Sequence, residues 1–235
     1  MLEKPRLRRP FFETAVKNYI YGDDVLNYAK LADEAARKHD VDVIFIAPYT
    51  EIRRVREACE SLLVFAPYMD TLAPGRGIAD VLPEALVAAG AQGVVLNHVE
   101  RPMTLAAIRG TIARANGLGM LTLACADSLA EAEAIAHLKV DILNPEPTEL
   151  IGTTANRDLS FVVDVTKAIR AISPRTLVEQ AAGITTAEQV YDMIMAGSDG
   201  VGSCSGILSA DDPAKTLLSM VAAVRQAAED RRMTW

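Results

Sequence analysis

The chain has 235 residues, a length that suits either one large domain or two small ones. Half of its residues are hydrophobic and the charged residues are spread along the chain, so we expect one buried core rather than a disordered segment. The net charge is −7 and basic residues gather only at 4–9, so we expect no binding to nucleic acid. No apolar run could span a bilayer or serve as a secretory signal, so we expect a cytoplasmic protein that does not bind a membrane.

One unit recurs along the chain: a short β-branched or aromatic run followed by a stretch of helical periodicity. The predicted strands are Phe12–Val16, Asp42–Ala47, Leu63–Ala66, Gly93–Leu96, Met120–Ala124, Asp141–Asn144, Thr176–Glu179 and Gly200–Gly202. The predicted helices are Asp23–His39, Ile52–Ala58, Leu82–Ala89, Thr104–Asn116, Leu129–His137, Ser160–Ile172, Thr186–Met195 and Pro213–Arg231. Eight such units predict the α/β class and a single-domain (β/α)8 barrel over residues 12–235, preceded by an N-terminal arm, residues 1–11. An open dinucleotide-binding sheet is disfavoured, because no Gly-rich turn follows the first strand.

The residues just after each strand are the candidates for function, because barrel active sites form at the carboxyl ends of the strands. An ammonium (Lys17), an imidazole (His98) and a carboxylate (Glu146) follow the first, fourth and sixth predicted strands. Glycine- and serine-rich turns at 181–183 and 203–206 follow the last two, where backbone N–H groups can hold a phosphate. Together these groups predict proton transfer beside a phosphate.

Each of these residues also has a simpler explanation. His98 alone is explained as a packed structural histidine, Lys17 as a solvated lysine, and Gly183 and Gly206 as residues that permit tight turns. Glu146 is harder to explain as a surface carboxylate, because a proline on each side stiffens the backbone.

The remaining histidines and the cysteines receive no catalytic role. His39 and His137 fall late in predicted helices, where an imidazole commonly serves the helix C-terminus. Cys59, Cys125 and Cys204 are widely spaced and odd in number, which predicts free thiols rather than a disulfide framework or a metal site.

Four segments resemble the triosephosphate isomerase family, most closely its short archaeal type. Residues 144–153, Asn-Pro-Glu-Pro-Thr-Glu-Leu-Ile-Gly-Thr, resemble the lid that carries the family's catalytic base. Residues 96–101, Leu-Asn-His-Val-Glu-Arg, resemble the segment of the electrophilic histidine, and residues 182–186 and 199–206 resemble the two phosphate-binding turns. The resemblance extends from about residue 12 to about residue 225.

The resemblance implies an aldose–ketose isomerase that acts on a small phosphorylated sugar and needs no metal or organic cofactor. Its implied catalytic residues are Glu146 as the base, His98 as a neutral electrophile, Lys17 as the cation and the neighbouring Glu100. The N-terminus of a helix near Arg101 and Pro102 would lower the pKa of His98. The implied phosphate ligands are the backbone N–H groups of Gly152, Gly183, Ser205 and Gly206, and residues 147–154 would form the closing lid.

The chain also departs from the family pattern. Ala15 stands where the family has an asparagine, Val99 replaces a serine, and the loop at 66–79, which commonly reaches a neighbouring subunit, is changed. Alternatives to triose phosphate therefore stay open: another short sugar phosphate such as a tetrulose phosphate, or a phosphosugar-binding barrel without turnover. A Schiff-base aldolase is a weaker alternative, because the sixth strand ends in Glu146 rather than a lysine. The resemblance further implies a homo-oligomer, a dimer or a tetramer.

Overall fold

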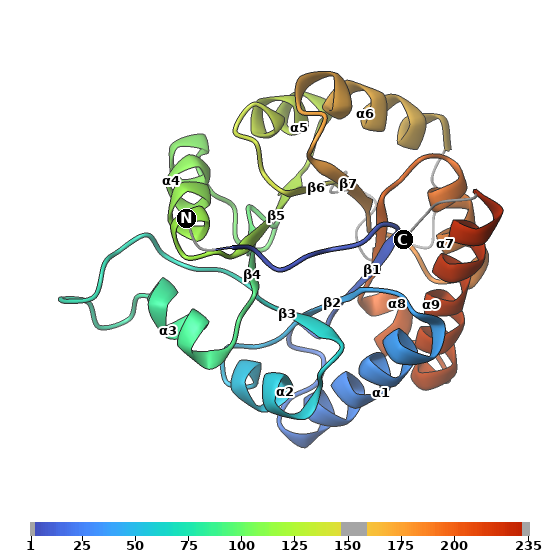
Figure 1. Ribbon diagram of the computed structural model, residues 1–235, viewed down its shortest axis with the longest axis horizontal. Coiled ribbons are helices and arrows are strands. Elements are labelled where there is room, and N and C mark those ends of the chain that lie inside the picture. Colours follow the sequence, from blue (N-terminus) through green and yellow to red (C-terminus); the bar gives the residue numbers. More distant parts are fainter. Residues whose placement is uncertain (1–2, 147–158, 232–235) are drawn as a thin grey trace.

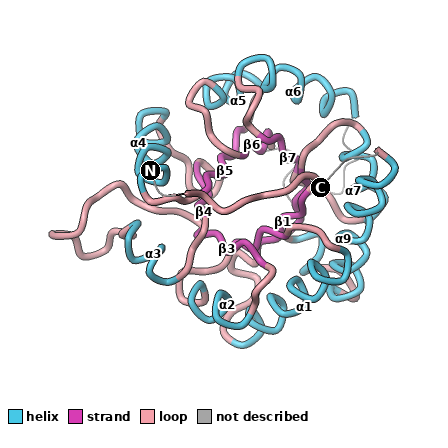
Figure 2. The backbone as a smooth tube through the Cα atoms, in the orientation of Figure 1, coloured by secondary structure: helices cyan, strands magenta, loops and turns pink. Residues whose placement is uncertain are grey.

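The computed structural model describes residues 3–146 and 159–231. Eight parallel strands form a closed barrel in the order β1 to β8, and helices surround it, which confirms the predicted (β/α)8 barrel (Figures 1 and 2). The strands are β1 (Phe11–Ala15), β2 (Val43–Ile46), β3 (Leu62–Ala66), β4 (Gly93–Leu96), β5 (Leu121–Ala126), β6 (Ile142–Pro145), β7 (Leu177–Gln180) and β8 (Gly200–Ser203). Pairing between β1 and β8 closes the barrel, with Phe12 opposite Val201 and Thr14 opposite Ser203.

The helices follow the predicted ranges to within two residues. They are α1 (Asp23–His39), α2 (Ile52–Ala58), α3 (Pro83–Ala89), α4 (Leu105–Gly117), α5 (Leu129–Ala136), α6 (Leu159–Ile172), α7 (Ala187–Met195), α8 (Ser205–Leu208) and α9 (Pro213–Asp230). The short α8 was not predicted, because four residues are too few to show a helical period. No helix in the described part of the chain is long and apolar enough to cross a membrane.

Hydroxyl and carboxylate side chains fix where several helices begin. Thr104, Ser128 and Asp212 each accept a hydrogen bond from a backbone N–H in the first turn of α4, α5 and α9. Thr186 and Gln189 form a reciprocal capping box at the start of α7. These caps begin each helix within a few residues of the preceding strand or turn, so the loops that carry the functional residues are held at both ends.

Two apolar clusters bury the strands on both faces. One lies inside the barrel and includes Phe11, Ile44, Phe65 and Leu123. The larger one lies between the barrel and the surrounding helices, where the opposite faces of the same strands contribute residues such as Phe12 and Phe45. Burying apolar side chains of this size contributes about 1.5–3 kcal/mol each, so both clusters stabilise the closed barrel.

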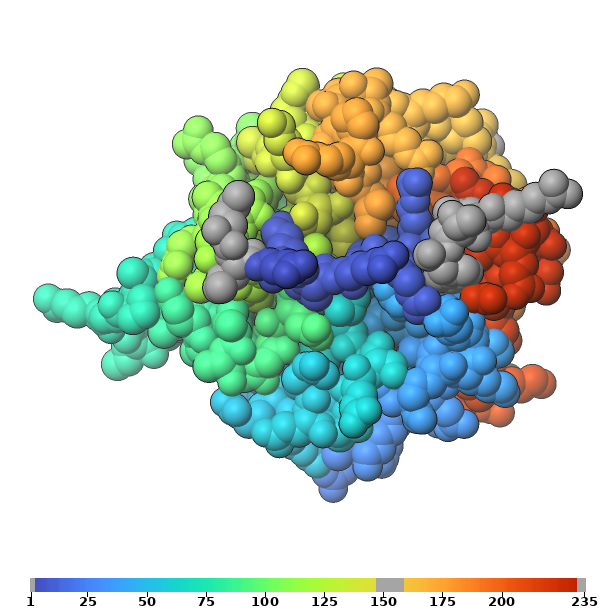
Figure 3. Space-filling view, viewed as in Figure 1, coloured from blue at the N-terminus to red at the C-terminus, as the bar shows by residue number. Residues whose placement is uncertain are grey.

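Residues 3–10 of the N-terminal arm run across the end of the barrel where the strands begin (Figures 1 and 3). Leu7 packs against the interior cluster from this side. Arg8 pairs with Asp42 at 2.7 Å, and Arg9 pairs with Asp199 at 3.2 Å. The arm therefore covers the end of the barrel opposite the predicted site.

Candidate active site

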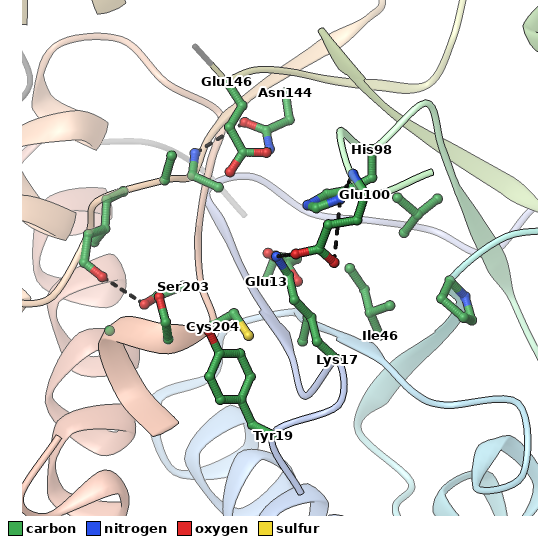
Figure 4. A pocket seen from close by; sticks show the side chains of 18 of the residues that line it. Glu13, Lys17, Tyr19, Ile46, His98, Glu100, Asn144, Glu146, Ser203 and Cys204 are labelled. Atoms are coloured by element: carbon green, nitrogen blue, oxygen red, sulfur yellow. Dashed lines mark hydrogen bonds and ion pairs between the residues drawn. The ribbon is translucent and has the colours of Figure 1, made fainter. Parts of the chain in front are cut away.

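A cavity of about 1210 Å³ opens at the carboxyl ends of the strands. Its lining contains every predicted site residue within the described part of the chain: Lys17, His98, Glu100, Glu146, Gly183, Ser205 and Gly206. Figure 4 shows the first four of them around the cavity. Gly152 and the predicted lid, residues 147–154, lie outside the described residues. The predicted groups therefore come together from five strands, which an isolated structural histidine or a solvated lysine would not require.

Glu146 follows β6 directly and is held from two sides. Its backbone N–H donates to the carbonyl of Ala126 on β5 at 2.7 Å, and its side chain is buried. The Nδ2 of Asn144 donates to Glu146 Oε2 at 3.3 Å, while Asn144 Oδ1 accepts the N–H of Ala181 at 3.1 Å. Asn144 thus orients the carboxylate and links it to the residue that follows β7; Figure 4 shows Asn144 beside Glu146. A buried carboxylate fixed in this way has the geometry of a general base.

His98 follows β4 and is held as a neutral imidazole. The backbone N–H of Glu100 donates to its Nδ1 at 3.1 Å, so the proton of the neutral ring resides on Nε2, which is free to donate into the cavity. Burial lowers the pKa of His98, and the positive charge of Lys17 lowers it further. The helix N-terminus expected near Arg101 and Pro102 is not there: α4 begins at Leu105, and the residues around Arg101 are not helical.

Lys17 follows β1 with a positive φ of 45°, a conformation that is rare for a residue with a side chain. Its Nζ pairs with Glu100 Oε1 at 3.0 Å (Figure 4). Burial lowers the pKa of Lys17, but the hydrogen bond and charge of Glu100 outweigh that effect and the pKa is raised. The ammonium therefore stays charged at the cavity wall, with Glu100 as its positioning partner.

The two glycine-containing turns meet at the opposite wall. Gly183 has a φ of 69°, which favours glycine, and Gly206 lies in α8 against the first turn. A Cβ on Gly206 would stand 2.0 Å from the carbonyl oxygen of Ile184. Ser203 Oγ donates to the same oxygen at 2.7 Å, which fastens β8 to this turn. The first N–H groups of a helix have no partner within it, so the amides of Ser205 and Gly206 are available to an anion.

Comparison with known proteins agrees with this geometry. The sequence pattern of the family described as triosephosphate isomerase matches residues 14–224. The chain belongs to the triosephosphate isomerase family. It is 33% identical to "Triosephosphate isomerase" from Methanobacterium bryantii over 206 residues, which cover 86% of this chain and 91% of the relative. It is 34% identical to the proteins of that name from Methanopyrus kandleri, over 85% of this chain and 90% of the relative, and from Metallosphaera sedula, over 90% and 93%. The predicted family and the predicted enzyme class, an aldose–ketose isomerase, are confirmed.

The sequence patterns did not indicate two buried carboxyl residues that line this cavity of the triosephosphate isomerase family member. Glu13 on β1 and Glu179 on β7 line the same cavity from inside the barrel, and both are buried. Burial and the charge of Glu146 raise the pKa of Glu13 to about 8; burial and Glu13 raise that of Glu179 well above its ordinary value. A charged residue at an inward position of an otherwise apolar strand is the sequence signal that could have indicated them.

The three cysteines are free thiols, as predicted. Cys125 and Cys204 line the cavity. Burial is the main cause that raises the pKa of Cys204 to about 12 and that of Cys125 well above the ordinary value. Both thiols are therefore protonated near neutral pH and lack the thiolate that a nucleophilic cysteine needs.

Proposed function

We propose that this enzyme interconverts glyceraldehyde 3-phosphate and dihydroxyacetone phosphate, with Glu146 as the base. The observation that carries the proposal is that Glu146, His98 and Lys17 reach one cavity from the ends of β6, β4 and β1. A base, a neutral hydrogen-bond donor and a fixed cation are the three groups that proton transfer next to a carbonyl requires. The names of the relatives support the choice of a triose phosphate.

In the proposed mechanism, Glu146 removes a proton from the carbon next to the carbonyl and returns it to the adjacent carbon. His98 donates from Nε2 to the substrate oxygens, on which charge develops in the enediolate between the two steps. Lys17 supplies a fixed positive charge in a partly buried site, where such charge stabilises the intermediate more than in water. Glu146 thus carries a proton from one carbon to the neighbouring carbon, while His98 Nε2 gives a proton to the carbonyl oxygen and regains one from the neighbouring hydroxyl, so the protein ends each cycle in its starting protonation state.

The phosphate would bind at the opposite wall, on the amides of Gly183, Ser205 and Gly206. These three residues are uncharged, and Lys17, which lines the same cavity, supplies positive charge that favours a phosphate. Gly152 and the closing lid, residues 147–154, remain part of the proposal as the resemblance implies them.

The test is a coupled isomerase assay with glyceraldehyde 3-phosphate and with erythrulose phosphates as competing substrates. Replacing Glu146 by Gln keeps the size of the side chain and removes the base, so we expect turnover to fall by at least about 10²–10⁴-fold. Turnover of only a tetrulose phosphate would favour the second candidate, an isomerase for a longer sugar. The small side chain of Ala15 at the cavity wall supports this candidate, because it leaves space there. Binding of phosphosugars without turnover of any of them would contradict both.

We also propose a homo-oligomer. The loop before α3 projects far from the barrel (Figure 1), and Ile78 in this loop is fully exposed. An exposed large apolar side chain at the end of a projecting loop favours a partner surface. Light scattering after size-exclusion chromatography measures the mass directly, and a monomer at micromolar concentration would contradict the proposal.

A further inference from the structure

The floor of the cavity contains two carboxyl groups that the proposed mechanism does not use. Glu179 is fully buried, and neither of its carboxyl oxygens has a hydrogen-bond partner among the described residues. Glu13 is 7% exposed, and its Oε1 likewise has no partner there. Both side chains line the same cavity as Glu146 and Lys17, and Figure 4 shows Glu13 beside Lys17. The two groups therefore face the cavity in which the substrate is proposed to bind.

The two carboxyl groups converge because residue 202 has no side chain. Gly202 on β8 pairs with Glu13 on β1, and β7, which carries Glu179, lies on its other side. A Cβ on Gly202 would stand 2.3 Å from Glu13 Oε2 and 3.0 Å from Glu179 Oε1. Both oxygens thus occupy the space next to this glycine, at one point of the floor.

Leaving such groups unpaired is costly. A buried carboxyl without hydrogen bonds destabilises a fold, and buried polar groups in proteins are normally satisfied. An apolar residue at either position would avoid this cost, as it does at the neighbouring interior positions Phe11 and Leu177. The cost is offset if a ligand supplies the missing hydrogen bonds.

The chemistry of the pair selects hydroxyl groups as that ligand. Burial beside another carboxylate favours the protonated form of a carboxyl group, which both donates and accepts a hydrogen bond, as a hydroxyl does. A phosphate would meet the negative charge of Glu146 there. A metal ion is disfavoured, because no group of three or more His, Cys, Asp or Glu side chains suited to a metal occurs in residues 3–146 and 159–231.

We propose that Glu13 and Glu179 form a subsite for the hydroxyl groups of a sugar phosphate whose carbon chain is longer than three atoms. Ala15 lies two residues after Glu13 on the same inward face of β1 and is small, which leaves room for an added carbon above the pair. The inference rests on the site and the reaction of the proposed function, and it favours the second candidate named there, an isomerase for a longer sugar phosphate, over a triose phosphate. It adds that the floor recognises a further hydroxylated carbon.

Binding of two unreactive sugar alcohol phosphates tests this subsite. Glycerol 3-phosphate and erythritol 4-phosphate lack the carbonyl group and differ by one hydroxylated carbon, so their affinities can be measured by calorimetry without turnover. We expect the wild-type enzyme to bind the erythritol compound at least about 10-fold more tightly, which is the effect of one or two satisfied hydrogen bonds. Equal affinities, or no binding of the erythritol compound, would overturn the proposal.

Three variants assign the difference to the pair. The double substitution of Glu13 and Glu179 by Met keeps the volume and removes the polar atoms, so the preference for the longer compound should fall about 10-fold with little change for glycerol 3-phosphate. The double substitution by Gln keeps hydrogen bonding and should retain part of the preference. Glu57→Met, the same substitution on the exposed face of α2, should change neither affinity. An unchanged preference in the Met variant would overturn the proposal, with a thermal melt to verify that the variant is folded.

The isomerase assay on the wild-type enzyme separates this inference from the proposed function. If a triose phosphate turns over but the two alcohol phosphates bind equally, only the subsite is wrong. If no sugar phosphate turns over but the erythritol compound binds tightly and depends on Glu13 and Glu179, the subsite stands and the proposed reaction is wrong.

Discussion

Gly206 allows the two turns that are proposed to bind phosphate to approach each other closely, so its replacement by Ala is the sharpest single test of the site. The added Cβ would stand 2.0 Å from the Ile184 carbonyl oxygen and 2.8 Å from Ser203 Oγ. An ordinary contact of this kind is about 3.4 Å or longer, so the turn and α8 must move apart by more than 1 Å. Both partners are fixed, because Ile184 is buried and its carbonyl accepts the Ser203 hydroxyl.

A shift of about 1 Å in a positioned group can reduce the rate about 100-fold. We expect Gly206→Ala to lower kcat/KM by about that factor, mostly through KM, because the phosphate contributes binding in both the ground state and the transition state. Stability should fall by about 1–3 kcal/mol, as in other overpacked sites. The coupled assay and urea unfolding measure the two effects.

Gly117→Ala is the matched control. Gly117 ends α4, has no positive φ, and a Cβ there would meet no atom within 4 Å. Alanine is favoured over glycine in a helix by about 0.5–1 kcal/mol, so this variant should be as active as the wild type and slightly more stable. The reasoning is refuted if Gly206→Ala keeps the wild-type KM and unfolding midpoint.

Three further predictions follow from the charged and polar groups. The pKa of Glu13 is about 8 in the folded protein and 4.5 when unperturbed, so between these values the folded state keeps a proton that the unfolded chain has lost. The free energy of unfolding should therefore fall with rising pH by up to about 1.4 kcal/mol per pH unit. Melts of the wild type and of Glu13→Met across this range measure the difference, which should vanish if the carboxyl is ionised throughout. His98→Asn should lower kcat by about 10²–10⁴-fold, while His137→Asn should leave kcat unchanged. Because the pKa of His98 is lowered, any loss of kcat on the acid side that its protonation causes should occur below pH 6.5. A wild-type rate for His98→Asn in the coupled assay would exclude His98 from the chemistry. Asp199→Asn should lower the free energy of unfolding by about 2–3 kcal/mol, because the buried carboxylate accepts hydrogen bonds from the backbone N–H of Val178 and from an arginine of α6; an unchanged urea midpoint would contradict this role.

The barrel and most of the site could be predicted because both depend on local patterns. The repeat of strand and helix is written into consecutive residues, and barrel closure then brings every strand end to one face. Lys17, His98 and Glu146 needed only their position after a strand to be placed correctly.

Other features depend on how distant strands are staggered. The convergence of Glu13 and Glu179 requires the pairing of β1 and β8 and a glycine at the right register, which no local pattern contains. The protonated nitrogen of His98 is fixed by the Glu100 amide, a detail of loop conformation. The lowered pKa of His98 likewise depends on its burial and on Lys17 from another strand, neither of which a local pattern contains.

Three aspartates at the end of the barrel where the strands begin allow the N-terminal arm to link strands of the barrel to one another. Asp42, Asp141 and Asp199 each stand one residue before a strand, β2, β6 and β8, and each pairs with a cation of the arm. These strands are spread around the circumference, so a single extended segment ties three points of the ring to one another. The ring therefore does not depend on the β1–β8 hydrogen bonds alone for its closure: separating β1 from β8 would also have to break the ion pairs that the arm makes with Asp199, before β8, and Asp141, before β6.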